Sequence, residues 1–482
     1  MPTIVCVIGL DVGTQGARAA AISPGGEVLA EASVPFVDAN LPVPEPRAEQ
    51  RPEAWWEASV RCLRSVADEL SGYDVRAISV DSTSGTFLPV SADGTPLRPA
   101  IMYNDGRAGA AIADEVQGAG REIADKLGYR FPPAFALPKM LWLKRNEPEA
   151  FDRAAKLLHA ADYIVGRLSG RFDVSDSSNA LKTGFDLCES CWPAFIESRL
   201  GIALSKLPDV VAPGTAVGHV TSAASAETGL ATQVAVIAGC TDGTAAFLAS
   251  GACAPGEWNA VLGTTLVLRG VSSHIIRDPM GRYYCHRHPE GAWLPGGASN
   301  VGGECLVRLY RDADLSALDS ACVSRLPTGL AVYPLVRKGE RAPFVSSTAE
   351  GFVIGTPVDD AERYAGYLEG VALVERWCLA TLEDLGAPVG PTIHATGGGS
   401  RSDVWLQVRA DVTQRRLVRP CVADAMMGAA LLAASHTLFD SLSDATRAMV
   451  RPQTVVHPRE GLASAYEDKL GRLIEECAAR GY

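Results

Sequence analysis

Short apolar runs separated by turn residues open the sequence. Val5–Leu10 is continuous and rich in β-branched residues, which predicts a buried strand. A polar turn at 11–16 leads from it to a second apolar run at Ala17–Ile22. A Pro-Gly-Gly turn then leads to Val28–Val34. The pattern therefore predicts an antiparallel meander at the start of the chain, not a βαβ unit.

Helical and strand patterns alternate along the rest of the chain. After a proline-rich loop at 38–52, apolar residues of 52–70 recur on one helical face. The stretch 107–168 is mainly helical, with breakers at a Pro-Pro pair and at Pro138. Further predicted strands are 77–80, 234–239 and 392–396, and further predicted helices are 245–250, 361–385, 403–413 and 426–434. The alternation of strands and helices predicts an α/β class.

The second half of the chain restarts with a hairpin. A strand is predicted at 258–262, a Gly-Thr-Thr turn follows, and the return strand covers 266–271. This echoes the opening hairpin and indicates a weak internal repeat. The small, turn-rich stretch Gly251–Gly256 lies just before it. We therefore expect two domains, 1–250 and 251–482.

Composition and charge narrow the classes of function. The chain has 482 residues, of which 47% are hydrophobic and 21% charged, so it suits two or three globular domains and not a disordered chain. Acidic residues outnumber basic ones by 56 to 44, which gives a net charge of −12. Such a surface repels phosphate backbones, so we expect no nucleic-acid partner. A phosphorylated small molecule in a local pocket remains compatible with this charge.

No targeting or membrane segment is expected. The N-terminus lacks a basic region, Asp11 interrupts its apolar run, and no apolar stretch reaches the ~18 residues that span a bilayer. The twelve scattered cysteines then indicate reduced thiols in a cytoplasmic protein without a membrane partner.

Two local groups of cysteine and histidine bear on metal binding. Cys188 and Cys191 have C-x-x-C spacing, but no second such pair completes a zinc site. Cys285, His286 and His288 lie at one end of a predicted strand. We interpret both groups as small apolar thiols and a surface histidine pair, and metal binding at either place is the minor alternative.

Three Gly/Thr-rich turns follow predicted strands and indicate phosphate chemistry. They begin at Asp11, at Gly263 and at Thr396. Glycine lets the backbone approach a phosphate, and threonine adds a hydroxyl donor. Each turn alone is more often a plain turn, but the three occur together with Asp242 after another strand. P-loop, dinucleotide-binding and protein-kinase motifs are absent from the sequence.

The order of these motifs resembles the FGGY carbohydrate kinases, which share a superfamily with actin, hexokinase and heat-shock ATPases. The motifs are Asp-x-Gly-Thr, Thr-Asp-Gly, Gly-Thr-Thr and Gly-Gly-Gly followed by Trp-x-Gln-x-x-Ala-Asp. The matching stretches are Ile8–Ala21, Ile78–Arg107, Gly239–Gly251, Gly263–Thr265, Gly339–Gly355, Tyr367–Ala372 and Ala395–Asp411. The resemblance implies an α/β fold of two ribonuclease-H-like (actin/hexokinase-type ATPase) domains flanking a deep cleft. Domain 1–250 would bind sugar and carry the catalytic base, and domain 251–482 would bind the nucleotide.

The resemblance also implies roles for individual residues. Asp242 matches the catalytic base and Asp11 the carboxylate that holds Mg²⁺. The substrate-binding residues would be Asp11, Ser82, Thr83, Ser84, Gly85, Asp105 and Asp242. The nucleotide-binding residues would be Gly13, Thr14, Gln15, Gly263, Thr264, Thr265, Gly297, Gly397, Gly398, Gly399 and Asp403. The chemistry agrees, because an alcohol is a poor nucleophile and a placed carboxylate that accepts its proton supplies roughly 10²–10⁴-fold. A turn-capping aspartate is the structural alternative for Asp242.

The choice of sugar depends on the segment Asp81–Thr86. It reads Asp-Ser-Thr-Ser-Gly-Thr, where xylulokinases carry Gln-Met-His-Gly and glycerol kinases Gln-Arg-Glu. The Ser-Thr-Ser-Gly-Thr form is similar to a branch associated with D-ribulose, although such residues also cap turns. Asn104, Asp105 and Arg107 are placed to reach sugar hydroxyls, and Arg107 pairing with Asp105 as structure is the alternative.

Two departures from the family pattern concern the nucleotide region. Val422–Gly428 stands where relatives often have an acidic residue and glycine before the last Ala-rich helix, and Asp403 stands where some have Asn. We expect an ATP-dependent, Mg²⁺-requiring kinase of a free ketopentose, with D-ribulose before D-xylulose or another ketose or polyol. A homodimer is common among such kinases. A non-catalytic ATP switch of the chaperone or filament type is the alternative from another class, and a dead kinase retained as a sugar sensor is disfavoured because both aspartates are present.

Overall fold

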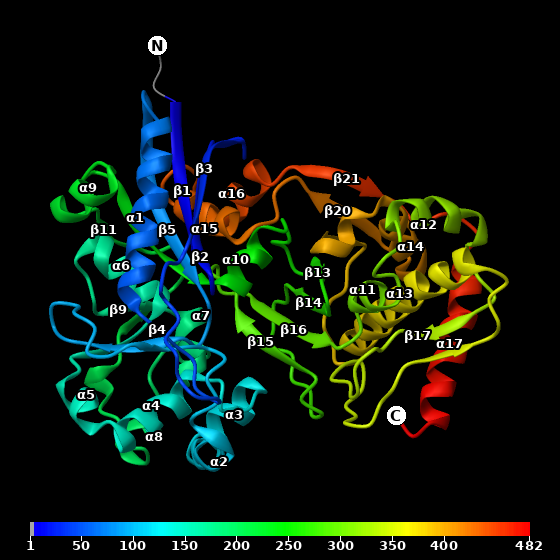
Figure 1. The fold of residues 1–482 in the computed structure, drawn as a ribbon, viewed down its shortest axis with the longest axis horizontal. Coiled ribbons are helices and arrows are strands. Elements are labelled where there is room, and N and C mark those ends of the chain that lie inside the picture. The colour runs from blue at the N-terminus through cyan, green and yellow to red at the C-terminus, as the bar shows by residue number, and fades with distance from the viewer. Residues whose placement is uncertain (1–3) are drawn as a thin grey trace. The chain divides into compact units, whose positions relative to one another are not determined.

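The computed structural model describes residues 4–482 as two compact units (Figure 1). The first unit comprises the described chain up to Ala249, together with Pro289–Gly291 and Asp424–Arg451. The second comprises Ser250–His288, Ala292–Ala423 and Pro452–Tyr482. The chain thus first changes unit after Ala249, and Asp424–Arg451 packs with the first unit although it follows most of the second along the chain. The sequence pattern did not predict that Asp424–Arg451 packs with the first unit, because a helix that is apolar on all sides does not indicate which sheet it covers.

A six-stranded sheet forms the centre of the first unit, in the order β11-β12-β5-β1-β2-β3. Its strands are β1 (Ile4–Val12), β2 (Gly16–Ile22), β3 (Val28–Pro35), β5 (Tyr73–Ser82), β11 (Ala216–His219) and β12 (Ala235–Thr241). The pairs β1–β2 and β2–β3 are antiparallel, which confirms the predicted meander. The strands β1, β5 and β12 run parallel, so their carboxyl ends share one edge.

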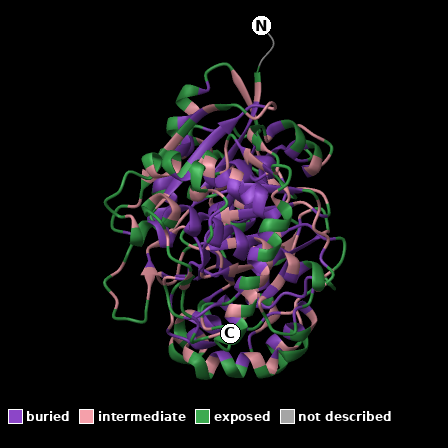
Figure 2. Ribbon diagram, turned by 90° about the vertical axis from the view of Figure 1, so that its right-hand side faces the viewer, coloured by how far each residue is buried: buried purple, intermediate pink, exposed green. Residues whose placement is uncertain are grey.

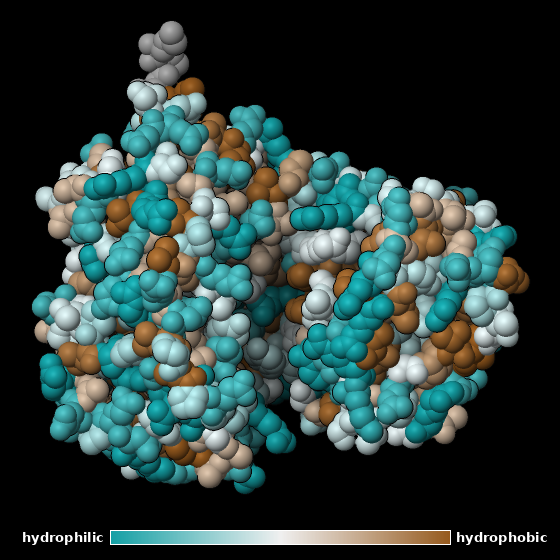
Figure 3. All heavy atoms as spheres, in the orientation of Figure 1, coloured by the Kyte–Doolittle hydropathy of each residue, from teal (hydrophilic) through white to brown (hydrophobic). Residues whose placement is uncertain are grey.

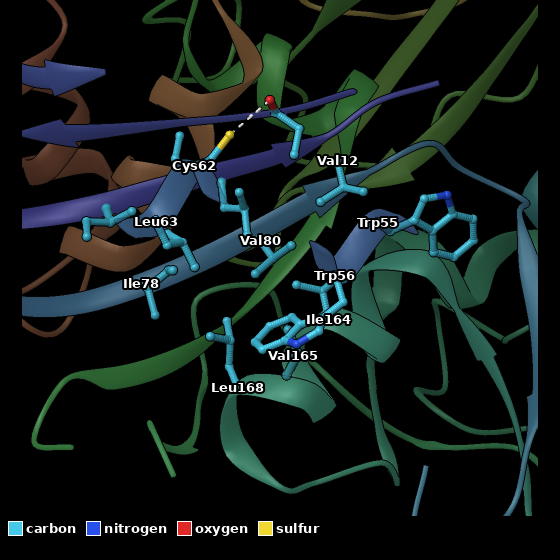
Figure 4. Packing of buried hydrophobic residues seen from close by; sticks show 14 of the residues in the cluster. Val12, Trp55, Trp56, Cys62, Leu63, Ile78, Val80, Ile164, Val165 and Leu168 are labelled. Carbon is cyan, nitrogen blue, oxygen red and sulfur yellow. Dashed lines mark hydrogen bonds between the residues drawn. The ribbon is translucent and has the colours of Figure 1, made fainter. Parts of the chain in front are cut away.

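Helices cover the two faces of this sheet. α1 (Pro52–Glu69) and α6 (Ala160–Ser169) bury Trp55, Leu63 and Ile164 in one cluster with Ile78 and Val80 of β5 (Figure 4). α15 (Ala425–Ala434) packs against β1 so closely that a Cβ added at Gly9 would lie 1.8 Å from the Met426 carbonyl oxygen. Each buried aliphatic or aromatic side chain contributes about 1.5–3 kcal/mol, so these two layers hold the strand ends in place.

The remainder of the first unit contains two smaller sheets, β4-β7-β6-β8 and β10-β9. Smaller strands are β4 (Glu49–Gln50), β6 (Phe87–Val90), β7 (Ala100–Ile101), β8 (Lys156–His159), β9 (Val174–Asp176) and β10 (Asp209–Val211). Other helices are α2 (Gly109–Ala119), α3 (Arg121–Leu127), α4 (Ala136–Asn146), α5 (Pro148–Arg153), α7 (Ser177–Ala180), α8 (Phe195–Ser198), α9 (Ser222–Thr228), α10 (Asp242–Leu248) and α16 (Leu442–Met449). Pro138 does not break its helix, because it lies in the first turn of α4, where a missing N–H costs no helical bond.

A seven-stranded sheet, β15-β16-β14-β13-β19-β20-β21, forms the centre of the second unit. Its strands are β13 (Trp258–Leu262), β14 (Leu266–Gly270), β15 (Tyr283–Arg287), β16 (Trp293–Ser299), β19 (Thr392–Thr396), β20 (Arg416–Pro420) and β21 (Pro452–Val456), with a separate pair β17 (Ala331–Tyr333) and β18 (Phe352–Ile354). Its helices are α11 (Glu304–Leu309), α12 (Leu315–Cys322), α13 (Asp360–Asp384), α14 (Asp403–Thr413) and α17 (Ala463–Ala479). The predicted hairpin, the strand at 392–396 and the helix at 403–413 are confirmed.

Burial follows the sheets in both units. The central strands are buried, and exposed residues concentrate in loops and on the outer sides of helices (Figure 2). On the face drawn in Figure 3, hydrophobic side chains lie in small groups among hydrophilic ones. Within residues 4–482 no helix combines the length and the apolar character needed to cross a membrane.

Candidate active site

Three aspartates gather where the parallel strands of the first unit end. Asp11 lies opposite Asp81 in the pairing of β1 with β5, and Asp81 lies opposite Cys240 in the pairing of β5 with β12. Asp242 follows two residues later, as the first residue of α10. Since parallel strands end at the same edge, the fold itself brings these carboxylates together.

Burial dominates the electrostatics of Asp11 and Asp81. Asp11 is 4% exposed and pairs with Arg18 of β2 at 3.2 Å, yet desolvation still raises its pKa. Asp81 is fully buried, and desolvation followed by the negative charges of Asp11 and Asp242 raises its pKa well above the usual range. No N–H or O–H group within residues 4–482 donates to either Asp81 oxygen. The interaction between the two carboxyl groups opposes the rise in the pKa of Asp11 and adds to the rise in the pKa of Asp81.

Sequence reasoning did not select Asp81 as a site residue. The signal was present, because an aspartate at the end of a buried strand is the same feature that singled out Asp11 and Asp242. What the sequence did not give is the register that places Asp81 directly between the other two strand ends.

Asp242 differs from its two neighbours in being only partly buried. Its Oδ1 accepts the N–H of the next residue, Gly243, at 2.6 Å, whereas the N-cap position of α10 is held by Thr241. Two hydrogen bonds fix the end of β12 just before Asp242. The N–H of Thr241 donates to Ser178 Oγ at 2.9 Å, and Ser178 Oγ donates to Asp176 at 2.5 Å. Asp242 therefore projects from a fixed point at the edge of the sheet.

The hydroxyl-rich loop Ser82–Thr86 continues directly from β5. The Oγ atoms of Thr83 and Thr86 lie 3.0 Å apart, and Lys182 donates to Ser84 Oγ at 2.6 Å. Gly85 has a φ of 85°, a left-handed conformation that favours glycine, and a Cβ there would lie 3.2 Å from both the Ala134 carbonyl and the Lys182 side chain. The four predicted residues Ser82, Thr83, Ser84 and Gly85 thus lie together, next to Asp81. Lys182 is a further residue at this loop that sequence reasoning missed.

Asp105 is buried and held by hydrogen bonds from the protein itself, and its role as a substrate ligand stays a prediction. Its Oδ1 accepts the N–H and Nε of Arg107, and its Oδ2 accepts the N–H of Ala48 and Nη2 of Arg107. Arg107 also pairs with Glu49 at 2.7 Å and stacks on Trp142. The structural alternative of an Arg107–Asp105 pair is therefore the one that the side chains adopt, because a buried carboxylate needs several donors.

The first Gly/Thr turn closes the hairpin between β1 and β2. The N–H of Gly13 donates to the carbonyl of Gly16 at 3.0 Å, and the carbonyl of Thr14 accepts from Gln50 at 2.9 Å. Gln15 is exposed. This turn lies in the first unit, directly beyond Asp11.

The other two turns lie side by side at one edge of the second unit. β13 and β19 are parallel, with Val261 opposite Thr396, so the turns Gly263–Thr265 and Gly397–Gly399 follow neighbouring strand ends. Gly397 has a φ of 84°, and a Cβ there would lie 2.6 Å from the Leu262 carbonyl oxygen. Asp403 is the first residue of α14, 75% exposed, and pairs with Arg419 at 2.9 Å. The structure thus brings together every predicted nucleotide residue of this unit except one.

That exception is Gly297, which lies inside the sheet. It pairs with Leu268 of β14 and Tyr283 of β15, and a Cβ there would lie 2.5 Å from the Arg282 carbonyl oxygen. The glycine is explained by close strand and ring packing, so the prediction of a nucleotide ligand is not supported by its position.

The metal-binding alternatives find no support in the arrangement of side chains. No group of three or more His, Cys, Asp or Glu residues within 4–482 is arranged to hold a metal ion. His286 and His288 are buried, so the expected surface histidine pair is wrong: the edge strand β15 is covered, not open to solvent. Cys188 and Cys191 are exposed, not packed as apolar thiols.

Comparison with known proteins decides the family. The chain matches the N-terminal domain of the FGGY family of carbohydrate kinases over residues 6–249 and its C-terminal domain over residues 243–437. The chain belongs to this family. It is 26% identical to a xylulose kinase of Bacillus subtilis over 96% of this chain and 94% of that protein, and 26% identical to a gluconokinase of Bacillus licheniformis over 91% and 90%.

A solved structure agrees with this membership. The crystal structure of xylulose kinase from Rhodospirillum rubrum is 29% identical, covers 98% of both chains and superposes with a TM-score of 0.86. The predicted two-domain α/β fold of the actin/hexokinase-like ATPases and the predicted class of enzyme, a carbohydrate kinase, are confirmed. Kinases of this family use ATP as the co-substrate, so the alternative of a non-catalytic ATP switch is set aside.

Proposed function

We propose that this FGGY kinase transfers the terminal phosphoryl group of ATP to a primary hydroxyl of a free ketopentose, with D-ribulose as the first candidate. The observation that carries the proposal is the edge of the first unit, where Asp11, Asp81 and Asp242 end three parallel strands and the loop Ser82–Gly85 supplies hydroxyls beside them. Small hydroxyl side chains both donate and accept, as recognition of a polyol requires.

Asp242 suits the catalytic base better than its neighbours. It is partly exposed at the edge, whereas Asp81 is fully buried and desolvation raises its pKa, which disfavours the carboxylate form that must accept a proton. A short aspartate fixed at a strand end accepts the proton of the sugar hydroxyl without reorganisation, and this supplies roughly 10²–10⁴-fold. The rest of the catalysis comes from positioning and charge stabilisation.

Asp11 fits the Mg²⁺ that the family implies. Mg²⁺ prefers hard oxygen ligands and keeps most of its waters, so a single carboxylate beside the phosphates suffices and a cluster of three ligands is not needed. Burial raises the pKa of Asp11, and Arg18, which pairs with Asp11 at 3.2 Å, opposes this rise and so favours the ionised form that such an ion requires. When bound, Mg²⁺ neutralises charge on the transferred phosphoryl group.

Two observations favour different ketopentoses. The Ser-Thr-Ser-Gly-Thr loop resembles the D-ribulose branch and lacks the Gln-Met-His-Gly of xylulokinases. The name xylulose kinase among the relatives favours D-xylulose as the alternative substrate. The name gluconokinase adds gluconate as a further candidate. We place D-ribulose first because the loop touches the site directly.

A coupled ADP-release assay with ATP and Mg²⁺ tests the proposal. The panel contains D-ribulose, D-xylulose, L-ribulose, L-xylulose, ribitol, xylitol, glycerol, gluconate and a control without sugar. We expect kcat/KM for D-ribulose of at least ~10⁴ M⁻¹s⁻¹, well above every other sugar. A preference for D-xylulose would replace the first candidate by the second, and release that is equal across the panel and the control would overturn the ketopentose assignment.

A further inference from the structure

A buried lysine lies next to the loop Ser82–Thr86 and has no place in the chemistry described so far. Lys139 is in the first turn of α4 and is 0% exposed. Its Nζ donates to the Gly85 carbonyl at 2.9 Å and to the Met102 carbonyl at 2.7 Å. The side chain therefore connects the loop after β5 to the chain that follows β7.

A second bond fastens the same two segments. The N–H of Tyr103 donates to Thr86 Oγ1 at 3.0 Å, and Thr86 Oγ1 lies 3.0 Å from Thr83 Oγ1. Gly85 itself is in the left-handed conformation with little space around it. The loop is thus held at its backbone by Lys139 and at its side chains by Thr86.

The chemistry of Lys139 suits a tether. Both of its bonds go to carbonyl groups, and burial lowers its pKa to about 7; the nearby charge of Asp105 opposes this shift, while Lys182 and Arg107 add to it. A neutral amine still carries two N–H groups, which equals the number of carbonyls it serves. The tether therefore holds whether or not the lysine is protonated. A methionine would fill the same space without the cost of burying an amine, so packing alone does not explain a lysine here.

We propose that Lys139 is a positioning residue that sets the selection of the sugar by fixing the backbone of the loop Ser82–Gly85. This inference rests on the proposed function of that loop. A hydroxyl pattern distinguishes one ketopentose from another only if its donors and acceptors stay within a fraction of an ångström of their places. Lys139 supplies that rigidity, because it lies in the helix α4 and not in the loop itself.

The test compares Lys139→Met with Lys144→Met, a matched control on the same helix. Lys144 donates to the Leu200 carbonyl at 2.9 Å and does not touch the loop. For Lys139→Met we expect kcat/KM for the preferred sugar to fall by about 10–100-fold. The ratio of kcat/KM between the two best sugars should become smaller, and the KM for ATP should change by less than about two-fold. Lys144→Met should leave all three values unchanged. An unchanged sugar ratio in Lys139→Met, or an equal rise in the KM for ATP, would overturn the inference.

Two further measurements keep the test independent of folding and of the proposed function. Thr86→Val removes the hydrogen bond from the N–H of Tyr103 with almost no change in side-chain shape. It should also reduce the ratio of kcat/KM between the two best sugars. Hydrogen exchange of the amide of Tyr103 and of the amides at 83–87, in the protein without ligands, should accelerate in Lys139→Met and not in Lys144→Met. If no sugar of the panel is a substrate, the proposed function fails, while accelerated exchange would still support the tether; unchanged exchange would refute it.

Discussion

The two units contain sheets of the same order but with opposite chemistry at their edges. In the first unit the order β11-β12-β5-β1-β2-β3 places a parallel trio beside an antiparallel hairpin. In the second, six of the seven strands, in the order β21-β20-β19-β13-β14-β16, repeat this arrangement, including the antiparallel outer strand, and β15 adds a seventh strand next to β16. This repetition is what the faint likeness of the two hairpins in the sequence reflected.

The residues at the strand ends differ sharply. Asp11 faces Asp81 two residues before the first Gly-Thr turn, and at the matching positions of the second unit Val261 faces Thr396. Thr396 is neutral and donates to Asn259 at 3.0 Å. A carboxylate edge accepts protons and repels phosphates, while a neutral glycine edge lets backbone N–H groups approach an anion. The fold therefore repeats the same sheet edge in both units, and we expect the two or three residues that differ to decide whether an edge binds a sugar hydroxyl or a nucleotide.

The largest expected effect comes from neutralising the base. In Asp242→Asn the amide has the shape of the carboxylate but accepts no proton, so kcat should fall by roughly 10²–10⁴-fold, about 3–5 kcal/mol in the barrier. Binding of sugar and of ATP, measured by calorimetry, should persist, because neither the loop nor the second unit changes. Near-full activity of this variant would show that the base is another residue.

Much of this comparison was predictable from the sequence, and the limits have physical causes. The opening meander, the hairpin at 258–271 and the helix at 403–413 follow from local periods and turn residues, so they were predicted correctly. The partners of α15 and the strand register beside Asp81 depend on contacts between distant segments, which local patterns do not encode. Motif order selected Asp11, Asp242 and Gly297 alike, because it records positions along the chain and not the surroundings of each residue; the structure places the two aspartates at the end of parallel strands and Gly297 inside a sheet.

Buried lysines extend the comparison to the interior of each unit. Lys139 serves two carbonyls, whereas Lys469 of the second unit pairs with the buried carboxylate of Glu369 at 2.6 Å. Lys469→Met should cost roughly 3–5 kcal/mol in the free energy of unfolding, because it leaves a buried charge without its partner. Lys139→Met should cost clearly less, since only carbonyls lose a donor. Urea unfolding of both variants measures the difference, and equal losses would refute this distinction.

The variant Lys139→Met gives a pH dependence with a defined sign. The folded-state pKa of Lys139 is lowered to about 7 from a usual value near 10.5, so in this interval the unfolded chain binds more protons than the folded one. The contribution of Lys139 to the free energy of unfolding therefore rises with pH between about 7 and 10. Wild-type protein minus Lys139→Met should show this upward slope in unfolding experiments across that range, and a flat or falling difference would contradict the lowered pKa.

A smaller effect is expected at the glycine edge of the second unit. Gly397 has a positive φ and no space for a Cβ, whereas an added Cβ at Gly398 meets nothing within 4 Å. Gly397→Ala should lower the free energy of unfolding by about 1–3 kcal/mol and raise the KM for ATP, while the KM for the sugar stays constant. Gly398→Ala is the control and should change stability by less than about 1 kcal/mol. A rise in the sugar KM alone would reverse the assignment of the two edges.

The smallest effect is expected from the one predicted site aspartate of the second unit. Asp403 is 75% exposed, and its pair with Arg419 is of the surface kind that contributes about 0–1 kcal/mol. Asp403→Asn should therefore leave the melting temperature almost unchanged. It should raise the KM for ATP by about two- to five-fold, if the side chain contacts the nucleoside, and leave kcat intact. Asp403→Asn and Asp242→Asn compare the two units most directly. Both variants replace a carboxylate by an amide, and both do so at the first residue of a helix. If Asp403→Asn instead lowered kcat as far as Asp242→Asn does, the division into a proton-accepting edge and a phosphate-accepting edge would be lost.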